Sequence, residues 1–513
     1  MAVPGAAPVV VVGGGIAGLT AALELAENGV TVKLVESSGR LGGKITTSRV
    51  GGLIVEGGAD SMLSSKPAGL ALVDRLGIAE RLVNSNPDDR RTFVWSRGRL
   101  RELPEGLVLG SPARAWSLLR SGLLTAPGAA RLVGDIVVPR RRRDRDGATG
   151  EETVAEFFTR RLGPEAYTRV VEPLLGGIHA GDATRLSLPA TFPRFVEMER
   201  QHGGLVRAAL AGQVVPKLRR SLPGARSGPG PASADPRLRS PGYSGKGTPV
   251  RGSPTVGPVP AGRTPFVSFR TGMSDLVDAL AGRLRSLGVD VRTNAAVSLI
   301  RAVDGGYEVV LDDGAVLPGA AVVLATPAFV TARLARPLCP PAATLLEEIE
   351  HASTATVSLA YHADEVGTPP AGYGFVVPRG EGRHLLAGTW GSNKWPGRAP
   401  AGQVLLRGYV GGVGRESVLE AEDDGLVHLV RAELRALAGI RGTPVHAEVH
   451  RYPAGMPQYT VGHLARVERI RTALTACPGL AVTGAAYNGV GIPDCIADAL
   501  TTARAVLGGL ATP

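Results

Sequence analysis

Val9-Val-Val-Val-Gly-Gly-Gly-Ile-Ala-Gly18 is the stretch that decides the fold. Its four consecutive valines predict a strand that is buried on both faces. The glycines follow the spacing Gly13-x-Gly15-x-x-Gly18, and a helical pattern from Leu19 to Asn28 begins at once. Gly13 permits a tight turn, Gly15 lets a pyrophosphate approach the backbone, and Gly18 lets helix and strand pack closely. The stretch therefore predicts a dinucleotide site at a helix N-terminus, where free N–H groups attract phosphate.

The residues after that helix complete the unit. Thr31 to Val35 is a second predicted strand, and Glu36 follows it. A carboxylate at this position can accept hydrogen bonds from the hydroxyls of a ribose. The alternative is an ordinary βαβ unit with a glycine-rich turn, but strand, glycine turn, helix, strand and acid within about 30 residues favour a nucleotide site.

Two further glycine-rich segments come next. Ser37-Ser-Gly-Arg40-Leu-Gly-Gly43-Lys44 places two cations beside glycines, which suits a loop along a pyrophosphate. Glu56-Gly-Gly58-Ala59-Asp60-Ser61 supplies small residues that a flat ring can approach. Together the two segments resemble the amine-oxidase-like flavoprotein superfamily, and this resemblance implies FAD as the cofactor. A plain surface turn is the alternative for the second of them.

Length and charge limit the functional classes. A chain of 513 residues predicts two or more domains. The formal net charge is +11, but the excess lies in two loop-like runs, Arg140–Arg143 and 219–263. Because neither run follows a helix face, we expect solvated basic loops and no nucleic-acid partner, with contact to an anionic surface as the alternative.

Cysteine usage and hydropathy bear on location. Cys339, Cys477 and Cys495 are widely spaced, which predicts neither a metal site nor a disulfide framework and suits a reducing cytoplasm. The N-terminus has no charged signal region, and no apolar run reaches the roughly 18 residues of a spanning helix. We therefore expect a cytoplasmic protein, with peripheral membrane contact left open.

Three blocks together resemble the oxygen-dependent FAD porphyrinogen oxidases of haem synthesis. The first reaches Lys66-Pro67 and includes Gly58-Ala-Asp-Ser61. The second is Glu172-Pro-Leu-Leu-Gly-Gly-Ile-His-Ala-Gly-Asp182 with Leu186-Ser187. The third joins Met456-Pro-Gln-Tyr459 to Tyr487-Asn-Gly-Val-Gly-Ile-Pro-Asp494. The residues of the third block resemble those of the bacterial branch of the family, which forms coproporphyrin.

The resemblance implies an α/β, amine-oxidase-like fold. We expect a Rossmann-like FAD-binding domain, a substrate domain of mixed sheet plus helices, and a helical region. The predicted segments are 1–66 (FAD-binding domain, first part), 67–215 (substrate and helical region), 216–263 (disordered low-complexity insertion), 264–335 (FAD-binding domain, second part), 336–465 (sheet of the substrate domain) and 466–513 (FAD-binding domain, C-terminal part). Within the helical region, Pro164 to Gly177 is a predicted helix, interrupted near Pro173.

The implied reaction is the FAD-dependent oxidation of coproporphyrinogen III to coproporphyrin III. Six electrons leave in three steps, with O₂ as acceptor and H₂O₂ as product. The implied partners are the porphyrinogen and O₂, and contact with a downstream ferrochelatase is left open. Alternatives are a protoporphyrinogen IX oxidase, an amine oxidase or carotenoid desaturase that shares only the first block, and a non-catalytic nucleotide- or nucleic-acid-binding protein.

The candidate site residues come from these blocks. Lys66 is the candidate catalytic residue, with an exposed lysine as the alternative. His179 and Arg97 are candidates for substrate binding. The family usually has Tyr in place of His179 and often Trp in place of Tyr452, and Arg97 can equally lie on a solvated hairpin edge with Arg99 and Arg101. No metal ligand is predicted. The cofactor-binding candidates are Gly13, Gly14, Gly15, Ile16, Ala17, Gly18, Glu36, Ser37, Arg40, Gly43, Lys44, Gly58, Ala59, Asp60, Ser61, Val297, Tyr452, Ala485, Val490, Gly491 and Ile492.

Overall fold

The fold is built around a five-stranded parallel sheet in the order β10-β2-β1-β14-β20. The computed structural model describes residues 7–104, 117–141, 150–211, 259–367 and 372–511. The valine run forms β1 at the centre of this sheet, where its side chains are buried. The strands are β1 (Val9–Val12), β2 (Val32–Val35), β10 (Asp290–Arg292), β14 (Ala321–Leu324) and β20 (Leu480–Val482). Segments far apart in the chain therefore meet in one sheet.

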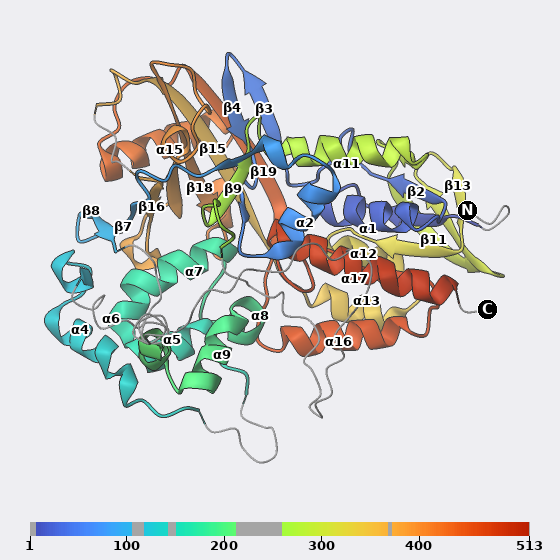
Figure 1. The fold of residues 1–513 in the computed structure, drawn as a ribbon, viewed down its shortest axis with the longest axis horizontal. Helices are drawn as coiled ribbons and strands as arrows, with labels where there is room; N and C mark the ends of the chain where they lie inside the picture. The colour runs from blue at the N-terminus through green and yellow to red at the C-terminus, as the bar shows by residue number, and fades with distance from the viewer. Residues whose placement is uncertain (1–6, 105–116, 142–149, 212–258, 368–371, 512–513) are drawn as a thin grey trace, which may run out of the picture.

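Each face of this sheet has its own apolar core. On one face pack α1 (Ile16–Glu27), α2 (Pro67–Arg75), α11 (Ser274–Ser286) and α17 (Ile492–Leu510). On the other lie α12 (Ala328–Ala335), α13 (Pro340–Glu347), α16 (His463–Leu474) and an antiparallel sheet of β11 (Val297–Val303), β12 (Gly306–Leu311) and β13 (Val316–Gly319). Helices α1 and α17 lie side by side (Figure 1). Burial of both faces explains why the strands are almost wholly apolar.

A seven-stranded sheet forms the second layer, in the order β19-β15-β18-β17-β16-β7-β8. Its strands are β7 (Thr92–Ser96), β8 (Arg99–Leu103), β15 (His351–His362), β16 (Gly374–Val376), β17 (Ala387–Trp390), β18 (Gln403–Gly411) and β19 (His446–Pro457). Helix α15 (Asp423–Ala438) packs on it through Leu426, Val430 and Leu434. All neighbours are antiparallel except β7 and β16.

Short elements connect the two layers. They are β3 (Thr47–Val50), β4 (Leu53–Glu56), β5 (Met62–Leu63), β6 (Leu82–Asn84), β9 (Phe266–Phe269), α14 (Gly391–Lys394) and the 3-10 turns η1 (Ala79–Arg81), η4 (Arg379–Glu381) and η5 (Glu416–Glu420). A further 3-10 turn, η2 (Gly134–Ile136), directly follows the helix at Ala126–Val133. Strand β9 pairs with both β5 and β6, so the chain after the predicted insertion returns to the segments that precede the helical region.

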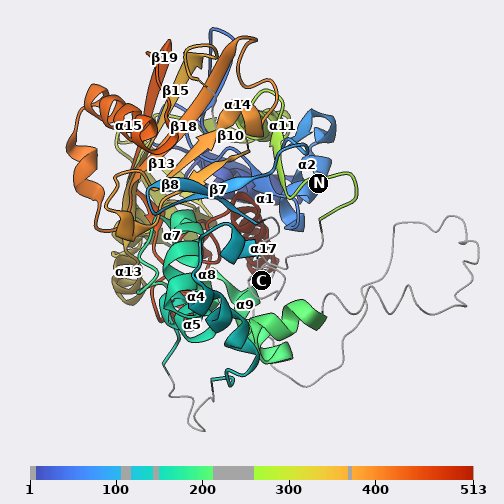
Figure 2. The same cartoon turned by 90° about the vertical axis from the view of Figure 1, so that its left-hand side faces the viewer.

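A group of helices gathers below the second sheet (Figure 2). They are α4 (Ala126–Val133), α5 (Val154–Leu162), α6 (Pro164–Ala166), a π-helical turn η3 (Tyr167–Val171), α7 (Glu172–His179), α8 (Leu188–Thr191) and α9 (Pro193–His202). Thr153 and Glu156 form a capping box that starts α5, and Phe157 and Phe158 fill the core of the group.

The described elements confirm the predicted fold class, with local differences. The helix expected from Pro164 runs through the π-helical turn η3 into α7, and the change from π-helix to α-helix lies just before Pro173. The hairpin expected around Arg97, Arg99 and Arg101 is formed by β7 and β8, and it also joins the second sheet. The predicted insertion lies outside the described residues except for 259–263. In the described part of the chain, no helix has the length and apolar character needed to cross a membrane.

Candidate functional site

The glycine turn between β1 and α1 combines tight packing with one opening. Gly13 has a φ of +110°, and a Cβ on Gly18 would lie 1.8 Å from the Gly13 carbonyl oxygen. Both positions therefore require glycine. A Cβ on Gly15 would meet no atom within 4 Å. Gly15 begins α1 without a side-chain cap, so the first N–H groups of the helix face open space beside it. This opening suits an anionic ligand.

Glu36 lies next to the same turn. Its Oε2 accepts a 2.7 Å hydrogen bond from the Gly14 N–H, and its Oε1 accepts 2.8 Å bonds from the N–H and hydroxyl of Ser38. Ser37 contributes a longer hydroxyl contact of 3.3 Å to Oε1. The residues before β11 lie beside this segment, because the Ala295 N–H donates to the Glu36 carbonyl. Val297, at the start of β11, follows Ala295 by two residues and therefore lies near the Glu36 segment in space.

The two cations of the next loop have different surroundings. The Arg40 guanidinium donates to the carbonyls of Gly43 (2.5 Å) and Ile45 (3.3 Å), so it braces its own loop. Lys44 makes no hydrogen bond or ion pair with another described residue. Its side chain is solvent-accessible, yet the surrounding protein desolvates it and lowers its pKa. A lysine that is both accessible and desolvated can gain from pairing with an anionic ligand.

Gly57 and Gly58 are held between this loop and strand β19. A Cβ on Gly58 would lie 1.9 Å from the Lys44 carbonyl oxygen and 3.1 Å from the Tyr452 hydroxyl. A Cβ on Gly57 would lie 2.7 Å from the His450 ring. The structure therefore brings together three sequence candidates: Gly58, Lys44 and Tyr452. Burial raises the pKa of Tyr452, which keeps its hydroxyl neutral.

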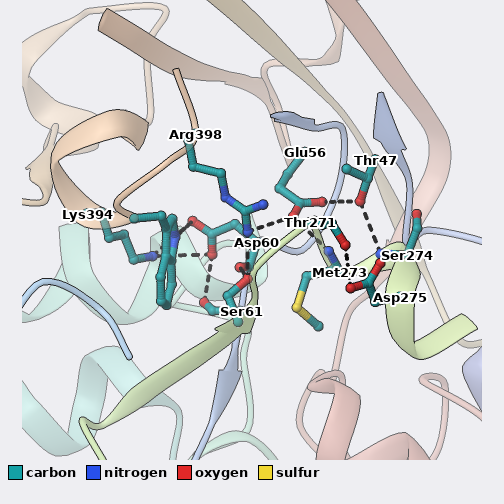
Figure 3. A network of polar contacts seen from close by, with 12 residues as sticks. Thr47, Glu56, Asp60, Ser61, Thr271, Met273, Ser274, Asp275, Lys394 and Arg398 are labelled. Atoms are coloured by element: carbon teal, nitrogen blue, oxygen red, sulfur yellow. Dashed lines mark hydrogen bonds and ion pairs between the residues drawn. The ribbon is translucent and has the colours of Figure 1, made fainter. Parts of the chain in front are cut away.

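A buried ionic network supports the Glu56–Ser61 segment (Figure 3). Asp60 accepts bonds from Lys394 Nζ (3.0 and 3.2 Å) and from the Trp395 indole N–H (3.2 Å), and Arg407 lies 3.4 Å away. Burial alone would raise the pKa of Asp60, but Lys394 and Arg407 hold it well below its usual range. The Asp60 carboxylate thus binds side chains of the protein itself. The contacts of Ala59, Asp60 and Ser61 with the cofactor stay a prediction.

Arg407 and Arg398 extend this network to the backbone. Arg407 Nη1 donates to the carbonyls of Glu56 and Gly58, each at 2.8 Å, and Arg398 Nη2 pairs with Glu56 at 3.0 Å. Sequence analysis missed Arg398, Arg407 and Lys394. The available signal for Arg407 was an arginine inside the apolar strand that became β18, where it is only 6% exposed.

The loop before α17 forms the part of the site that comes from the C-terminal segment of the chain. The Tyr459 hydroxyl donates to the Ala485 carbonyl (2.6 Å) and accepts from the Gly489 N–H (2.8 Å). Gly484 approaches Ala17 of α1, because a Cβ on Gly484 would lie 3.9 Å from the Ala17 Cβ. Gly491 begins α17 without a side-chain cap. The candidates Ala485, Val490, Gly491 and Ile492 therefore lie in a loop that meets the start of α1.

Lys66 is not a free base. Its Nζ lies 2.5 Å from Oδ2 of Asp494, in the first turn of α17, and both side chains are largely buried. Asp494 Oδ1 is buried and has no hydrogen-bond partner among the described residues. Burial raises the pKa of Asp494, against the pull of Lys66. The pair thus holds one carboxylate oxygen that can accept a proton.

The two substrate candidates lie in different surroundings. His179 ends α7, is 4% exposed and contacts the rings of Phe192 and Tyr459. Burial, with a contribution from Lys66, lowers the pKa of His179 to about 4, so the ring is neutral. Arg97 lies at the β7–β8 turn, 40% exposed, and pairs with Glu165 at 3.3 Å. That hairpin is at the opposite edge of the seven-stranded sheet from β19, so the structure does not bring Arg97 beside Tyr452.

Taken together, these elements fit a dinucleotide with two phosphates. They offer an uncapped helix start at Gly15, a cation at Lys44 that has no partner among the described residues, and a carboxylate at Glu36. The loop around Gly58 adjoins Lys44, and the loop before α17 meets Ala17 of α1. The network of Asp60 and Arg407 keeps the Gly58 loop in place.

Comparisons with known proteins agree with this geometry. Residues 16–507 match the family described as flavin containing amine oxidoreductase. The chain is 37% identical, over 97% of its length and 90% of the relative's, to "Coproporphyrinogen III oxidase" of Propionibacterium freudenreichii subsp. freudenreichii. It is 30% identical to "Protoporphyrinogen oxidase, chloroplastic" of Nicotiana tabacum, over 98% and 85% of the two chains. A crystal structure assigned as a protoporphyrinogen oxidase from Exiguobacterium sp. 255-15 has a TM-score of 0.79, 29% identity and 98% coverage of both chains.

Proposed function

Because the chain belongs to the flavin-containing amine oxidoreductase family, we propose that it oxidises a porphyrinogen, with coproporphyrinogen III as its preferred substrate. The chain is an oxidoreductase with FAD as its cofactor. The observation that carries the substrate proposal is the 37% identity, over nearly the whole chain, to a relative named for coproporphyrinogen III. The second candidate substrate is protoporphyrinogen IX, supported by the relative that is 30% identical.

The proposed reaction removes six electrons from the porphyrinogen in three two-electron steps, with O₂ as final acceptor and H₂O₂ as product. Bound FAD supplies the two-electron acceptor, which no protein side chain can provide. The protein then has to hold the cofactor, orient the substrate, exclude water and accept protons. A contact with a ferrochelatase or with a membrane surface would be an addition to this function.

The residues that would hold FAD follow from the site. The pyrophosphate would lie at the start of α1, over Gly13, Gly14, Gly15, Ile16, Ala17 and Gly18, with Lys44 as counter-charge and Gly43 in the facing loop. Glu36 would bind the ribose that adjoins this pyrophosphate. The ring system would extend between the Gly58 and Tyr452 pair and the loop of Ala485, Val490, Gly491 and Ile492. Ser37, Arg40, Ala59, Asp60, Ser61 and Val297 complete the proposed set.

Proton transfer is assigned to the Lys66–Asp494 pair. Each oxidation step also releases one proton from the porphyrinogen, and the Lys66 Nζ is already engaged with Oδ2 of Asp494. Asp494 Oδ1, which has no partner within the described segments, can accept this proton, while Lys66 holds the carboxylate in place through Oδ2. Lys66 is therefore proposed as the residue that positions the acceptor. The neutral ring of His179 is proposed to face the substrate on the side of Tyr459.

Asp494→Asn should lower the rate of porphyrinogen oxidation by about 100-fold or more, because general base catalysis commonly contributes that much. FAD content should stay at the wild-type level. In the wild type, the rate should fall as the pH drops through the raised pKa of Asp494, because the protonated carboxyl cannot accept a proton. Steady-state rates across pH test this, with Asp290→Asn, in an exposed ion pair, as the matched control. An FAD-loaded Asp494→Asn variant with the wild-type rate would contradict the assignment.

Anaerobic mixing tests the substrate class. Coproporphyrinogen III should bleach the visible absorbance of the bound oxidised flavin, because the electrons pass to the cofactor without O₂. Putrescine, a diamine, should leave the absorbance unchanged. Bleaching by the amine and not by the porphyrinogen would replace the proposal with an amine oxidase.

A further inference from the structure

Two of the three cysteines occupy neighbouring segments that are far apart in the sequence. Cys339 lies between α12 and α13, and Cys477 lies in the turn between α16 and β20. The Cys339 thiol donates to the Ala473 carbonyl at 3.4 Å, and the Cys477 thiol donates to the Leu338 carbonyl at 3.3 Å. Leu338 is adjacent to Cys339, and Ala473 is four residues before Cys477, so each sulfur contacts the backbone close to the other cysteine.

The two thiols also contact each other. Burial raises the pKa of the Cys477 thiol, and the neighbouring Cys339 thiol raises it further through charge and a hydrogen bond. Both side chains pack in the same apolar cluster below the parallel sheet. A pair of thiols in such contact can be linked if one of them can be oxidised.

Access differs between the two sulfurs. A cavity of about 1670 Å³ runs along β20 and α17, and Leu338, Cys477 and Pro478 form part of its wall. Cys339 does not line this cavity and is 5% exposed. A small oxidant in the cavity therefore contacts the Cys477 sulfur before it can contact the more deeply buried Cys339 sulfur.

The third thiol serves as an internal reference. Cys495 lies in the first turns of α17, is buried, and approaches the Gly489 carbonyl at 3.6 Å. Burial raises the pKa of the Cys495 thiol to about 12, and it does not line the cavity. It has no thiol neighbour, since the only other cysteines of the chain are the pair described above.

We propose that Cys339 and Cys477 form a redox-active dithiol, which hydrogen peroxide converts into a disulfide. The Cys477 thiol first loses its proton, and the thiolate then attacks one peroxide oxygen. The O–O bond breaks, and the departing hydroxide takes up that proton, which gives a sulfenic acid and water. The Cys339 sulfur then attacks the Cys477 sulfur, the S–S bond forms, and the displaced hydroxide leaves as a second water with the Cys339 proton. Two thiols lose two electrons in all, and one H₂O₂ is reduced to two H₂O. This site goes beyond the proposed function and does not depend on it.

The link would join the α12–α13 junction to the α16–β20 turn. It closes a loop of more than a hundred residues, so it restricts the unfolded chain strongly. The oxidised protein should therefore melt at a higher temperature than the reduced one. Since most of Cys477 is protonated at neutral pH, we expect the reaction with peroxide to be slow, and diamide provides a second oxidant.

The test uses the full-length, FAD-loaded protein, treated with H₂O₂ or diamide, alkylated under denaturing conditions and digested. We expect the free thiols to fall from three to one, with a Cys339–Cys477 linked peptide and alkylated Cys495 in the mass spectrum, all reversed by dithiothreitol. Cys339→Ser should stop at a sulfenic acid on Cys477 that dimedone traps. The proposal would be overturned by any of three results with the wild type: three thiols remain, the link involves Cys495, or Cys477 is oxidised to a sulfinic acid without a link.

Discussion

Gly15→Ala should weaken FAD binding by about 10- to 100-fold while the stability of the FAD-free protein stays unchanged. The Cβ would meet no protein atom within 4 Å, and the φ of −73° at Gly15 is one that alanine adopts freely. The protein should therefore accept the methyl group. The proposed pyrophosphate, however, has to occupy that space, and forcing an extra methyl into a packed contact costs about 1–3 kcal/mol.

Two measurements separate these effects. Flavin fluorescence during titration of the FAD-free protein gives the dissociation constant, and thermal melting of the same protein gives its stability. Gly18→Ala is the matched control, because its Cβ would lie 1.8 Å from the Gly13 carbonyl and should impair folding itself. Wild-type FAD affinity in the Gly15→Ala variant would place the pyrophosphate elsewhere.

Arg407→Met should destabilise the protein by about 3–5 kcal/mol, the usual cost of removing one partner from a buried ionic group. The guanidinium donates to the Glu56 and Gly58 carbonyls and lies beside Asp60. Methionine fills part of the volume but leaves these acceptors without a donor. The Gly58 loop should also lose its position, so the purified variant should carry less FAD.

Urea unfolding at neutral pH measures the first effect, and the ratio of flavin to protein measures the second. Arg200→Met is the matched control, because Arg200 and Glu197 form an exposed pair with 70% and 44% accessible side chains. Such solvent-exposed pairs contribute little to stability. Equal losses in the two variants would mean that the network around Asp60 does not support the site.

The nucleotide unit was predictable because its signals are local. The valine run, the spacing of Gly13, Gly15 and Gly18, and Glu36 all lie within one βαβ unit, and each follows from the conformation that the unit requires. Strand β14 was also predictable, since an apolar run that ends at a Thr-Pro turn fits a buried strand. The order of strands in either sheet could not be read from such local patterns.

The ionic contacts of the site were not predictable, because they join distant segments. Lys66 and Asp494 are 428 residues apart in sequence, and Asp60 and Lys394 are 334 residues apart. Each of these side chains, taken alone, has the sequence signal of an ordinary surface charge. The contact of Lys66 with Asp494 also changes the interpretation of Lys66, from a free base to a group that holds a carboxylate.

The central claim is tested most directly by aerobic turnover of the purified protein on coproporphyrinogen III and protoporphyrinogen IX in parallel, with porphyrin fluorescence and peroxide followed together. We predict faster formation of coproporphyrin III, with three H₂O₂ released per porphyrin. A preference for protoporphyrinogen IX would keep the reaction and reverse the substrate assignment. Failure of an FAD-loaded, folded protein to oxidise either compound would contradict the proposed function.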